Sequence, residues 1–566
     1  MPPRKQTDSS KQSICSSIGA LIRSRLRATT CKYVGFFVLL FISSYLYLSP
    51  LIITSVPQEP ISTDYLNADV SKRDAVRAAF QHAWSSYEQD AMGADEYHPI
   101  SHRGFNFSGD GGIGYTVVDA LDTMLIMGLH DEHARARQWI LDKHSFEREG
   151  NFNTFETTIR VLGGLLSAYH LAGDTLYLER AVDLADRLLP AFDTPTGLPL
   201  PMVNLAKRVG VRDQWSSDQI STAEAATLQL EFKYLAQLTR KNIYWSKVEN
   251  VMSVIYKSLL PHSLVPIFMS ASKGDFTQSD IRLGSRGDSY YEYLIKQYLQ
   301  TNRTEPIYKK MYADSMKGLH DNLVQKTSRQ GLTYIAELIP HRSKDGSVTW
   351  DRSAKQDHLV CFLAGSLMLG ATTSGAAKHF ISIPPRLEEL TQEGQRDWQT
   401  GVNLLETCMD THRTSTGLSP EIVMFRANEE KGESERDWFI KNSRKGGPSS
   451  YDARYMLRPE TVESLFIAWR LTGDLKYRQH AWNIFSAIEN HCRLEEGGYA
   501  TVLDVDTVPV SRDDKQETFF LSETLKYLYM TFSDSSIIPL DKYVFNTEGH
   551  PLPIFKPTDT KPAFAL

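Results

Sequence analysis

Long apolar runs, amphipathic runs and short polar turns follow one another from Val70 onward. The segments FETTIRVLGGLLSAYHLAGDTLYLERAVDLADRLL, from Phe155, and PETVESLFIAWRLTGDLKYRQHAWNIFSAI, from Pro459, share one layout. Each has an acidic start, a long apolar stretch, a Gly-Asp turn and then a tyrosine in an amphipathic stretch. Apolar positions at helical intervals predict α-helices, and few stretches alternate as strands do. The pattern therefore predicts repeated helical hairpins.

The hairpins recur at a nearly constant spacing. Starts at Glu156, Glu224, Asp288 and His358 lie 68, 64 and 70 residues apart, and others lie near Asp119, Glu460 and Phe519. About seven hairpins result, and they can stack as an open solenoid or close into a ring. The first helix of most hairpins is apolar on almost every face, which indicates burial rather than one wall of a solenoid. We therefore predict an all-α fold, a closed barrel of helical hairpins whose acidic inner-helix starts meet at one mouth.

The N-terminal part has a different pattern. Residues 1–32 carry seven basic side chains and one acidic one, whereas residues 33–53 carry no charge. About 20 apolar residues span a bilayer as a helix, and basic residues on the N-terminal side keep that side in the cytosol. A buried core helix is the alternative, but length and flanking charge favour a membrane span. We predict a cytosolic tail over 1–32, a transmembrane signal-anchor over 33–53, a lumenal stalk over 54–69 and the folded domain over 70–566.

Charge and cysteine content exclude several classes of protein. Lys and Arg number 62 against 68 Asp and Glu, so the net charge of -6 does not indicate nucleic-acid binding. Five cysteines without a CxxC pair do not indicate structural zinc. Cys361, Cys408 and Cys492 fall in the predicted lumenal part, where an oxidising environment allows three alternative pairings. Two sequons, at Asn106 and Asn302, are candidate glycosylation sites.

Acidic residues recur at the starts of the predicted inner helices. An acidic side chain at a helix start is also stabilised by the positive end of the helix dipole, and this alone is sufficient to explain any single acid. If the ring closes, however, one cavity receives Glu156, Glu224, Asp288, Glu460, Glu463 and Glu523. Crowded carboxylates raise one another's pKa, so that one stays protonated while another is ionised. Hydrolysis of a glycosidic bond needs such a pair.

Other side chains extend this hypothesis, and other chemistries lack their motifs. Phe519 and Glu523 share a helical face, which combines an aromatic ring with a hydroxyl acceptor. His358 has no second histidine at metal-ligand spacing, so we expect it to pack or to contact sugar. The sequence has no HExxH, GxSxG or Walker-type loop. A carboxylate-lined pocket also suits a hard cation such as calcium.

Seven segments carry a resemblance to one family: YTVVDALDTMLIMGL, FETTIRVLGGLLSAYHLAGD, GDSYYEYLIKQYL, DHLVCFLAGSLMLG, LRPETVESLFIAWRLTGD, ETFFLSETLKYLY and FNTEGHPLP. Together they resemble glycoside hydrolase family 47, the class I α-1,2-mannosidases of the early secretory pathway. The resemblance extends from about Val70 to the C-terminus, in the same order. It implies an (α/α)7 barrel, a bound calcium ion and hydrolysis with inversion at the mannose anomeric carbon.

The resemblance also implies roles for single residues. Glu156 falls at the general acid, thought to act through a water, Glu460 at the proposed general base, and Asp288 at a third catalytic carboxylate. Thr547 falls at the calcium-binding residue, with Glu463, Glu523 and Glu548 supporting the ion's waters. Further sugar-binding positions match Arg160, Glu224, Arg286, His358, Arg458, Glu463, Phe519 and Glu523. Cys361 and Cys408 match the family's disulfide.

These matches imply a calcium-dependent, inverting exo-α-1,2-mannosidase that trims Man9GlcNAc2 chiefly to Man8. Arg286 matches family members of endoplasmic-reticulum type, where Golgi-type members carry a smaller apolar residue. We therefore expect a monomeric type II protein of the endoplasmic reticulum membrane, with a Golgi location as the alternative, acting on high-mannose N-glycans. The rival class is a degradation-enhancing, glycan-binding relative with little hydrolysis. Such relatives typically lack the cysteine pair that this chain has.

Overall fold

The computed structural model describes residues 66–212, 218–427, 436–443 and 447–558. Asp64–Leu566 form one compact unit of the chain. The predicted cytosolic tail, the transmembrane segment and most of the stalk lie outside the described residues. Within the described ranges, no helix is long and apolar enough to cross a membrane.

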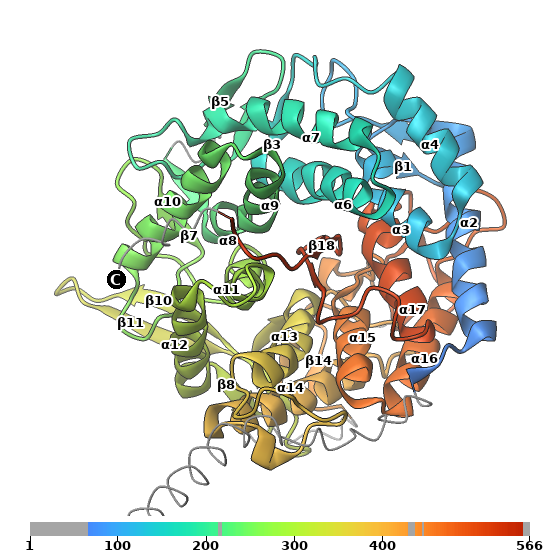
Figure 1. Ribbon diagram of the computed structural model, residues 1–566. Helices are drawn as coiled ribbons and strands as arrows, with labels where there is room; N and C mark the ends of the chain where they lie inside the picture. The colour runs from blue at the N-terminus through green and yellow to red at the C-terminus, as the bar shows by residue number, and fades with distance from the viewer. Residues whose placement is uncertain (1–65, 213–217, 428–435, 444–446, 559–566) are drawn as a thin grey trace, which may run out of the picture. The chain divides into compact units, whose positions relative to one another are not determined.

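The described helices form two concentric layers (Figure 1). The inner layer consists of α3 (Tyr115–Met127), α6 (Gly163–Ala172), α9 (Gln229–Thr239), α11 (Asp288–Gln300), α13 (Phe362–Thr373), α15 (Glu460–Thr472) and α17 (Leu525–Phe532). The outer layer consists of α2 (Val70–Ala91), α4 (His130–Asp142), α7 (Thr175–Leu188), α10 (Asn242–Ser258), α12 (Pro306–Asn322), α14 (Gln392–Thr411) and α16 (Leu475–His491). Each inner helix contacts the next, and α17 contacts α3. These contacts close the ring, as expected from the apolar inner helices, and exclude an open solenoid.

The repeated Gly-Asp turn links an inner helix to an outer helix. Gly173 and Gly473 end α6 and α15 in the left-handed conformation, with φ of 69° and 67°. Asp174 then accepts a hydrogen bond from the Leu176 amide (3.1 Å) and caps α7, and Asp474 caps α16 in the same way. A left-handed glycine followed by an aspartate N-cap reverses the chain with both helix ends satisfied. The sequence repeat is therefore a repeat of turn geometry.

Inner and outer helices differ in burial as their sequences predict. Residues Phe362–Thr372 of α13 are all buried, whereas α7 buries only one face, which includes Leu176, Ala181 and Leu188. An all-round apolar helix is stable only inside a protein, and an amphipathic helix covers it. The helix-rich class is confirmed for the described part of the chain.

Short strands, which the all-α expectation did not include, form eight small antiparallel sheets among the described residues. The strands are β1 (Glu96–His98), β2 (Arg103–Phe105), β3 (Asn151–Asn153), β4 (Met202–Asn204), β5 (Val209–Val211), β6 (Gln219–Ser221), β7 (Phe268–Ser270), β8 (Val324–Lys326), β9 (Thr333–Ile335), β10 (Glu337–Arg342), β11 (Val348–Ser353), β12 (Lys355–Asp357), β13 (Ile422–Phe425), β14 (Trp438–Phe439), β15 (Thr501–Val502), β16 (Arg512–Asp513), β17 (Tyr543–Phe545) and β18 (Pro551–Pro553). Most have only two or three residues, too few to show a period of two in the sequence.

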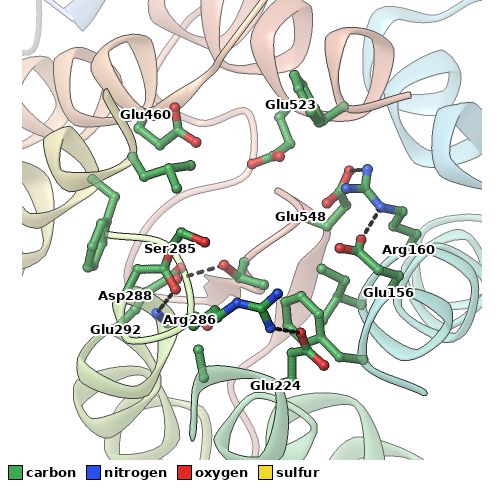
Figure 2. Close-up of a pocket in the computed structure, with 18 of the residues that line it drawn as sticks. Glu156, Arg160, Glu224, Ser285, Arg286, Asp288, Glu292, Glu460, Glu523 and Glu548 are labelled. Atoms are coloured by element: carbon green, nitrogen blue, oxygen red, sulfur yellow. Dashed lines mark hydrogen bonds and ion pairs between the residues drawn. The ribbon is translucent and has the colours of Figure 1, made fainter. Parts of the chain in front are cut away.

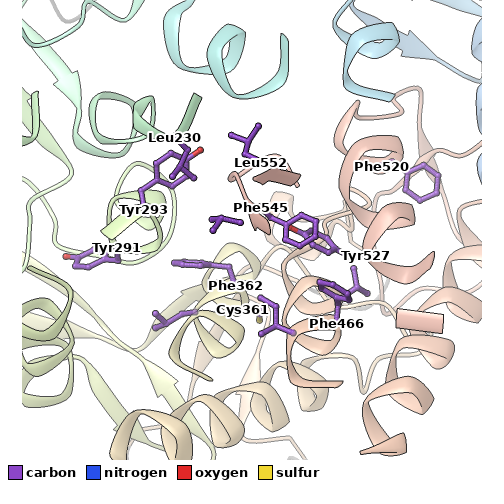
Figure 3. Packing of buried hydrophobic residues seen from close by; sticks show 14 of the residues in the cluster. Leu230, Tyr291, Tyr293, Cys361, Phe362, Phe466, Phe520, Tyr527, Phe545 and Leu552 are labelled. Carbon is purple, nitrogen blue, oxygen red and sulfur yellow. The ribbon is translucent and has the colours of Figure 1, made fainter. Parts of the chain in front are cut away.

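The hairpin β17–β18 fills the centre of the ring (Figures 1 and 3). The Phe545 ring centroid lies 5.5 Å from that of Tyr527 on α17 and 5.7 Å from that of Phe466 on α15. Ser167 on α6 donates a hydrogen bond to the Pro551 carbonyl (3.1 Å). Because the hairpin packs against several inner helices, its turn, which contains Thr547, is held at the bottom of the cavity described next.

Candidate active site

A cavity of about 300 Å³ lies where the inner helices begin (Figure 2). Its lining is mostly polar, with carboxylates and arginines from distant parts of the chain. Twenty-one residues line it: Phe155, Glu156, Ile159, Arg160, Ser221, Ala223, Glu224, Ser285, Arg286, Asp288, Ser289, Glu292, Leu359, Phe362, Arg458, Glu460, Glu463, Phe519, Glu523, Thr547 and Glu548. A cavity of this size with convergent polar groups is the expected form of a small-molecule site.

The three carboxylates with expected catalytic roles stand at helix starts around this cavity. Glu156 ends the short helix α5 (Thr154–Glu156), whose start is capped by Asn153 through a 2.8 Å bond to the Glu156 amide. Asp288 and Glu460 are the first residues of α11 and α15. Figure 2 shows Glu460 on one side of the cavity and Glu156 on the other. The closed ring thus brings together acids that lie about 300 residues apart in the sequence.

All the other residues assigned to sugar or metal binding also line the cavity, except His358. His358 is buried behind the wall, where its Nε2 lies 3.2 Å from Thr461 Oγ1 and 3.7 Å from Glu460 Oε2. Burial lowers the pKa of His358 well below its ordinary value, with the neighbouring His412 and Arg458 adding to the shift. The structure therefore places a neutral His358 against the back of Glu460, and not in the cavity lining.

Arginines hold several of the acids by ion pairs. Arg160 Nε donates to Glu156 (2.7 Å), and its Nη1 contacts Glu548. Arg286 lies 3.6 Å from Glu224. Such pairs limit the repulsion among the crowded carboxylates and fix their orientation.

Arg458 is held from behind the cavity by a residue that the sequence analysis did not identify. Glu421 accepts two hydrogen bonds from the Arg458 guanidinium, at 2.7 and 3.0 Å, and both side chains are largely buried. The ring of Phe519 contacts both Arg458 and Arg160, whose guanidinium carbons lie 5.4 and 5.7 Å from its centroid. These two cation–π contacts restrict the ring of Phe519 as well as the two arginines.

Burial among like charges raises the pKa of several carboxyls. Burial raises the pKa of Asp288 to about 7, and the carboxylates of Glu292 and Glu460 add to the shift. Burial likewise raises the pKa of Glu460 to about 7, although Arg458 opposes the shift. For Glu463 the pKa rises to about 8, mainly through burial, with Lys296 opposing. A site with raised carboxyl pKa values can hold both protonated and ionised acids near neutral pH.

Glu292 lines the cavity and its ion-pair partner Lys296 does not, and neither was given a role from the sequence. Thr547 Oγ1 donates a hydrogen bond to Glu292 Oε2 (2.8 Å), and Glu292 is also paired with Lys296. Glu292 lies four residues after Asp288, a spacing that places both carboxylates on one face of the helix. Lys296 gave no comparable signal, because a lysine within an apolar helix does not by itself indicate a pocket.

Two π-helical turns lie at the cavity, η2 (Thr157–Leu162), which contains Arg160, and η7 (Phe520–Thr524), which contains Glu523. Turns of this kind occur frequently at functional sites, because the wider turn redirects side chains. Sequence patterns do not distinguish a π turn from the α-helix that continues it.

The donor set at the bottom of the cavity suits a hard cation bound largely through water. Thr547 offers a hydroxyl and a carbonyl, and the carboxylates of Glu463, Glu523 and Glu548 line the same cavity. Glu460 Oε2 is buried with no hydrogen-bond partner among the described residues. Within the same ranges no three Asp, Glu, His or Cys side chains are close enough to bind an ion directly. The donors that line this part of the cavity are oxygen atoms, the kind that a hard cation such as calcium prefers.

The described cysteines and the two sequon asparagines are not among the residues that line this cavity. Cys361 and Cys408 form a disulfide that links the start of α13 to α14, and Cys492 is a buried free cysteine. Asn106 and Asn302 are both exposed.

A closed helical barrel with paired carboxylates and an aromatic ring in one cavity is typical of an enzyme that hydrolyses glycosidic bonds. The comparison with protein families agrees with this class. The model of glycosyl hydrolase family 47 matches residues 79–554. The chain therefore belongs to glycosyl hydrolase family 47, and is a glycosidase.

Individual relatives are similar over most of the chain. A mannosyl-oligosaccharide 1,2-alpha-mannosidase of Candida albicans is 43% identical over 495 residues, which cover 86% of this chain and 84% of the relative. The endoplasmic reticulum mannosyl-oligosaccharide 1,2-alpha-mannosidase of Schizosaccharomyces pombe is 41% identical, covering 88% and 92%. A solved alpha-1,2-mannosidase from Trichoderma reesei superposes with a TM-score of 0.74 at 29% identity, covering 86% of this chain and 100% of the other.

Proposed function

We propose that this protein is an inverting exo-α-1,2-mannosidase that removes terminal α-1,2-linked mannose from Man9GlcNAc2, chiefly to give Man8. The observation that carries the proposal is the cavity with Glu156 and Glu460 on opposite sides, in a chain of family 47. An inverting glycosidase needs an acid on one face of the scissile bond and a base on the other, with room for water between them. The names of the relatives indicate the sugar and the linkage.

Each carboxylate has a distinct task in this mechanism. Glu156, oriented by Arg160, supplies a proton to the leaving oxygen through a bound water. Glu460, on the opposite side, removes a proton from the water that attacks the anomeric carbon. Asp288 contributes a third carboxylate to the site. Phe519 offers a ring to the apolar face of the mannose, while Arg458 and Glu224 bind hydroxyls.

We further propose that calcium binds at Thr547, with Glu463, Glu523 and Glu548 holding its waters. Bound there, the ion would supply ligand positions for two sugar hydroxyls and help to distort the ring. Calcium favours oxygen donors and tolerates water in its shell, which fits the donors of this cavity. The carboxylates that surround the site would then orient water molecules.

The cellular setting belongs to the same proposal. Arg286 lies at the rim of the cavity, half exposed, and its match to members of endoplasmic-reticulum type favours removal of chiefly one mannose. The relative from Schizosaccharomyces pombe carries that compartment in its name. We propose a type II protein of the endoplasmic reticulum membrane, acting in N-glycan maturation and quality control.

The decisive experiment is incubation of the purified protein with Man9GlcNAc2, with calcium or with EDTA. We expect release of mannose with calcium, formation of a single main Man8 isomer, and loss of release with EDTA. Glycan that stays intact with metal present while still binding the protein would favour the non-hydrolytic relative. Undiminished release in EDTA would overturn the role of calcium alone.

A further inference from the structure

An open hollow of about 450 Å³ lies at the ends of the inner helices, whereas the catalytic cavity lies at their starts. Its lining includes His170, in the last turn of α6, and Asn302, two residues after the end of α11. The catalytic Asp288 is the first residue of α11, which has 13 residues and is therefore about 20 Å long. The hollow is thus separate from the catalytic cavity.

The hairpin β17–β18, which fills the centre of the ring (Figure 1), forms the apolar side of the hollow. Tyr543 on β17 is paired with Pro553 on β18 in the antiparallel register, and Ile554 follows Pro553. The rings of Tyr543 and His170 meet edge to face, with centroids 5.5 Å apart. All four side chains are only partly buried. An accessible aromatic ring beside aliphatic groups is a surface on which the apolar face of a sugar can pack.

Polar groups border this surface without adding net charge. Asp541 and Lys542 are both exposed and contribute one acid and one base. Burial lowers the pKa of His170 below its ordinary value, so that its ring is neutral near pH 7. The hollow therefore suits an uncharged ligand that is rich in hydroxyl and amide groups.

Asn302, which lines the hollow, begins the sequon Asn302-Arg303-Thr304 and is exposed. Its position is fixed by the backbone, because its amide donates a hydrogen bond to the Leu299 carbonyl (2.9 Å). The neighbouring Gln300 carbonyl accepts a hydrogen bond from the amide of Phe555, in the strand that leaves the hairpin (2.8 Å). A sugar attached to Asn302 is therefore held at the hollow from its first atom.

We propose that the hollow binds the N-acetylglucosamine core of an N-glycan attached to Asn302 of the same chain. The proposal rests on the secretory-pathway setting of the proposed function, and not on the mannosidase reaction. The first N-acetylglucosamine packs its apolar face on the Tyr543 ring, places its acetamide methyl against Pro553 and Ile554, and uses its hydroxyls to bind Asp541.

The attachment makes this contact intramolecular, so that weak packing is enough to keep the sugar in place. The sugar then joins the end of α11 to the hairpin β17–β18. Because the same hairpin carries Thr547 at the bottom of the catalytic cavity, the glycan helps to hold that residue from the opposite end of the barrel.

The test measures how readily endoglycosidase H, which cleaves between the two core N-acetylglucosamines, reaches the glycan of the native full-length chain. The chain is made in a host that attaches only high-mannose N-glycans, and mass spectrometry follows cleavage at Asn302 with time. Tyr543→Leu removes the ring from the hollow. Tyr451→Leu is the matched control, because Tyr451 is 55% exposed and does not line the hollow.

We expect Tyr543→Leu to speed cleavage at Asn302 about fivefold, the size expected for loss of one aromatic contact. Tyr451→Leu should leave the rate unchanged. Absence of a glycan at Asn302, or equal rates in the wild type and Tyr543→Leu, would overturn the proposal. A chain that protects this glycan but releases no mannose from Man9GlcNAc2 would reject only the hydrolytic function.

Hydrogen exchange provides a second measurement that does not depend on the folding of Tyr543→Leu. Asn302→Asp abolishes the sequon but keeps a residue that tolerates the left-handed φ of 51° at this position. Amide exchange over residues 541–555 should be about fivefold faster in Asn302→Asp than in the glycosylated wild type. Thr304→Ser, which keeps the sequon, should match the wild type. Equal exchange in all three proteins would show that the glycan does not contact the hairpin.

Discussion

His550 on the C-terminal hairpin lies with its Nδ1 2.8 Å from Asp122 Oδ2 on α3, and neither side chain is exposed. Its other nitrogen lies 2.9 Å from Asp119 Oδ1, and Lys526 on α17 lies 2.9 Å from Asp122. This network joins the first and last inner helices to the hairpin that fills the ring. It therefore holds together the point where the barrel closes.

Removing the histidine should loosen that closure. We predict that His550→Gln lowers the free energy of unfolding by about 3 kcal/mol, because two buried aspartates lose a charged partner. The measurement is chemical denaturation at pH 6. His341→Gln is the matched control, since His341 forms a comparable 3.1 Å pair with Asp351 in which both side chains are exposed. An equal effect in both variants would contradict a special role for the buried network.

The contribution of this network should also depend on pH. Burial alone would lower the pKa of His550, but the two aspartates raise it above its ordinary value. The stability that His550 contributes is therefore complete below its pKa in the unfolded chain, about 6.5, and is lost as the pH rises through its pKa in the folded protein. Lys526 and His550 lower the pKa of Asp122 to about 2 despite its burial. The stability that ionised Asp122 contributes is therefore lost only as the pH falls from about 4 toward 2. The stability difference between wild type and His550→Gln should thus be larger at pH 5.5 than at pH 9. A difference that grows with pH would contradict the assignment.

Glu460 is the residue whose loss should separate chemistry from binding. We predict that Glu460→Gln lowers kcat on Man9GlcNAc2 by about 10³-fold, because an amide cannot accept the proton of the attacking water. Glycan binding should stay measurable, since the amide keeps the size and shape of the carboxylate. Single-turnover kinetics with an equilibrium binding assay distinguish the two effects. Full activity would remove Glu460 from the mechanism.

Glu421 is predicted to act by positioning Arg458. Glu421→Gln keeps the volume but removes the charge that holds the guanidinium in two hydrogen bonds. We expect kcat/KM to fall about 10- to 100-fold while the protein stays folded, with Glu421→Asp recovering part of the loss. Glu406→Gln, which removes the partner of an exposed lysine, is the control. If Glu421→Asp recovers nothing and the melting temperature falls, the role is structural.

The sequence predicted the acids of the cavity better than their supports. Glu156, Asp288 and Glu460 could be predicted because each lies at or shortly before the start of an inner helix, and ring closure then brings these helix starts together. Glu421 lies in a loop, and its partner is set by tertiary contacts that no local pattern contains. His358 follows strand β12 and starts a 3₁₀ turn, so the helical pattern of the sequence does not predict the direction of its ring.

Calcium binding should be detectable through stability as well as activity. A ligand that binds only the folded state raises the free energy of unfolding by about 2.7 kcal/mol at 100 times its Kd. We therefore predict that calcium raises the Tm of the wild type and that Thr547→Val abolishes most of this rise. Valine removes the hydroxyl while keeping a similar shape, so the hairpin should still pack in the ring. Glu292, which accepts the Thr547 hydrogen bond, provides the second variant, because Glu292→Gln should weaken the rise only partly. A Tm that calcium leaves unchanged in the wild type, or raises equally in Thr547→Val, would show that the ion does not bind at this residue.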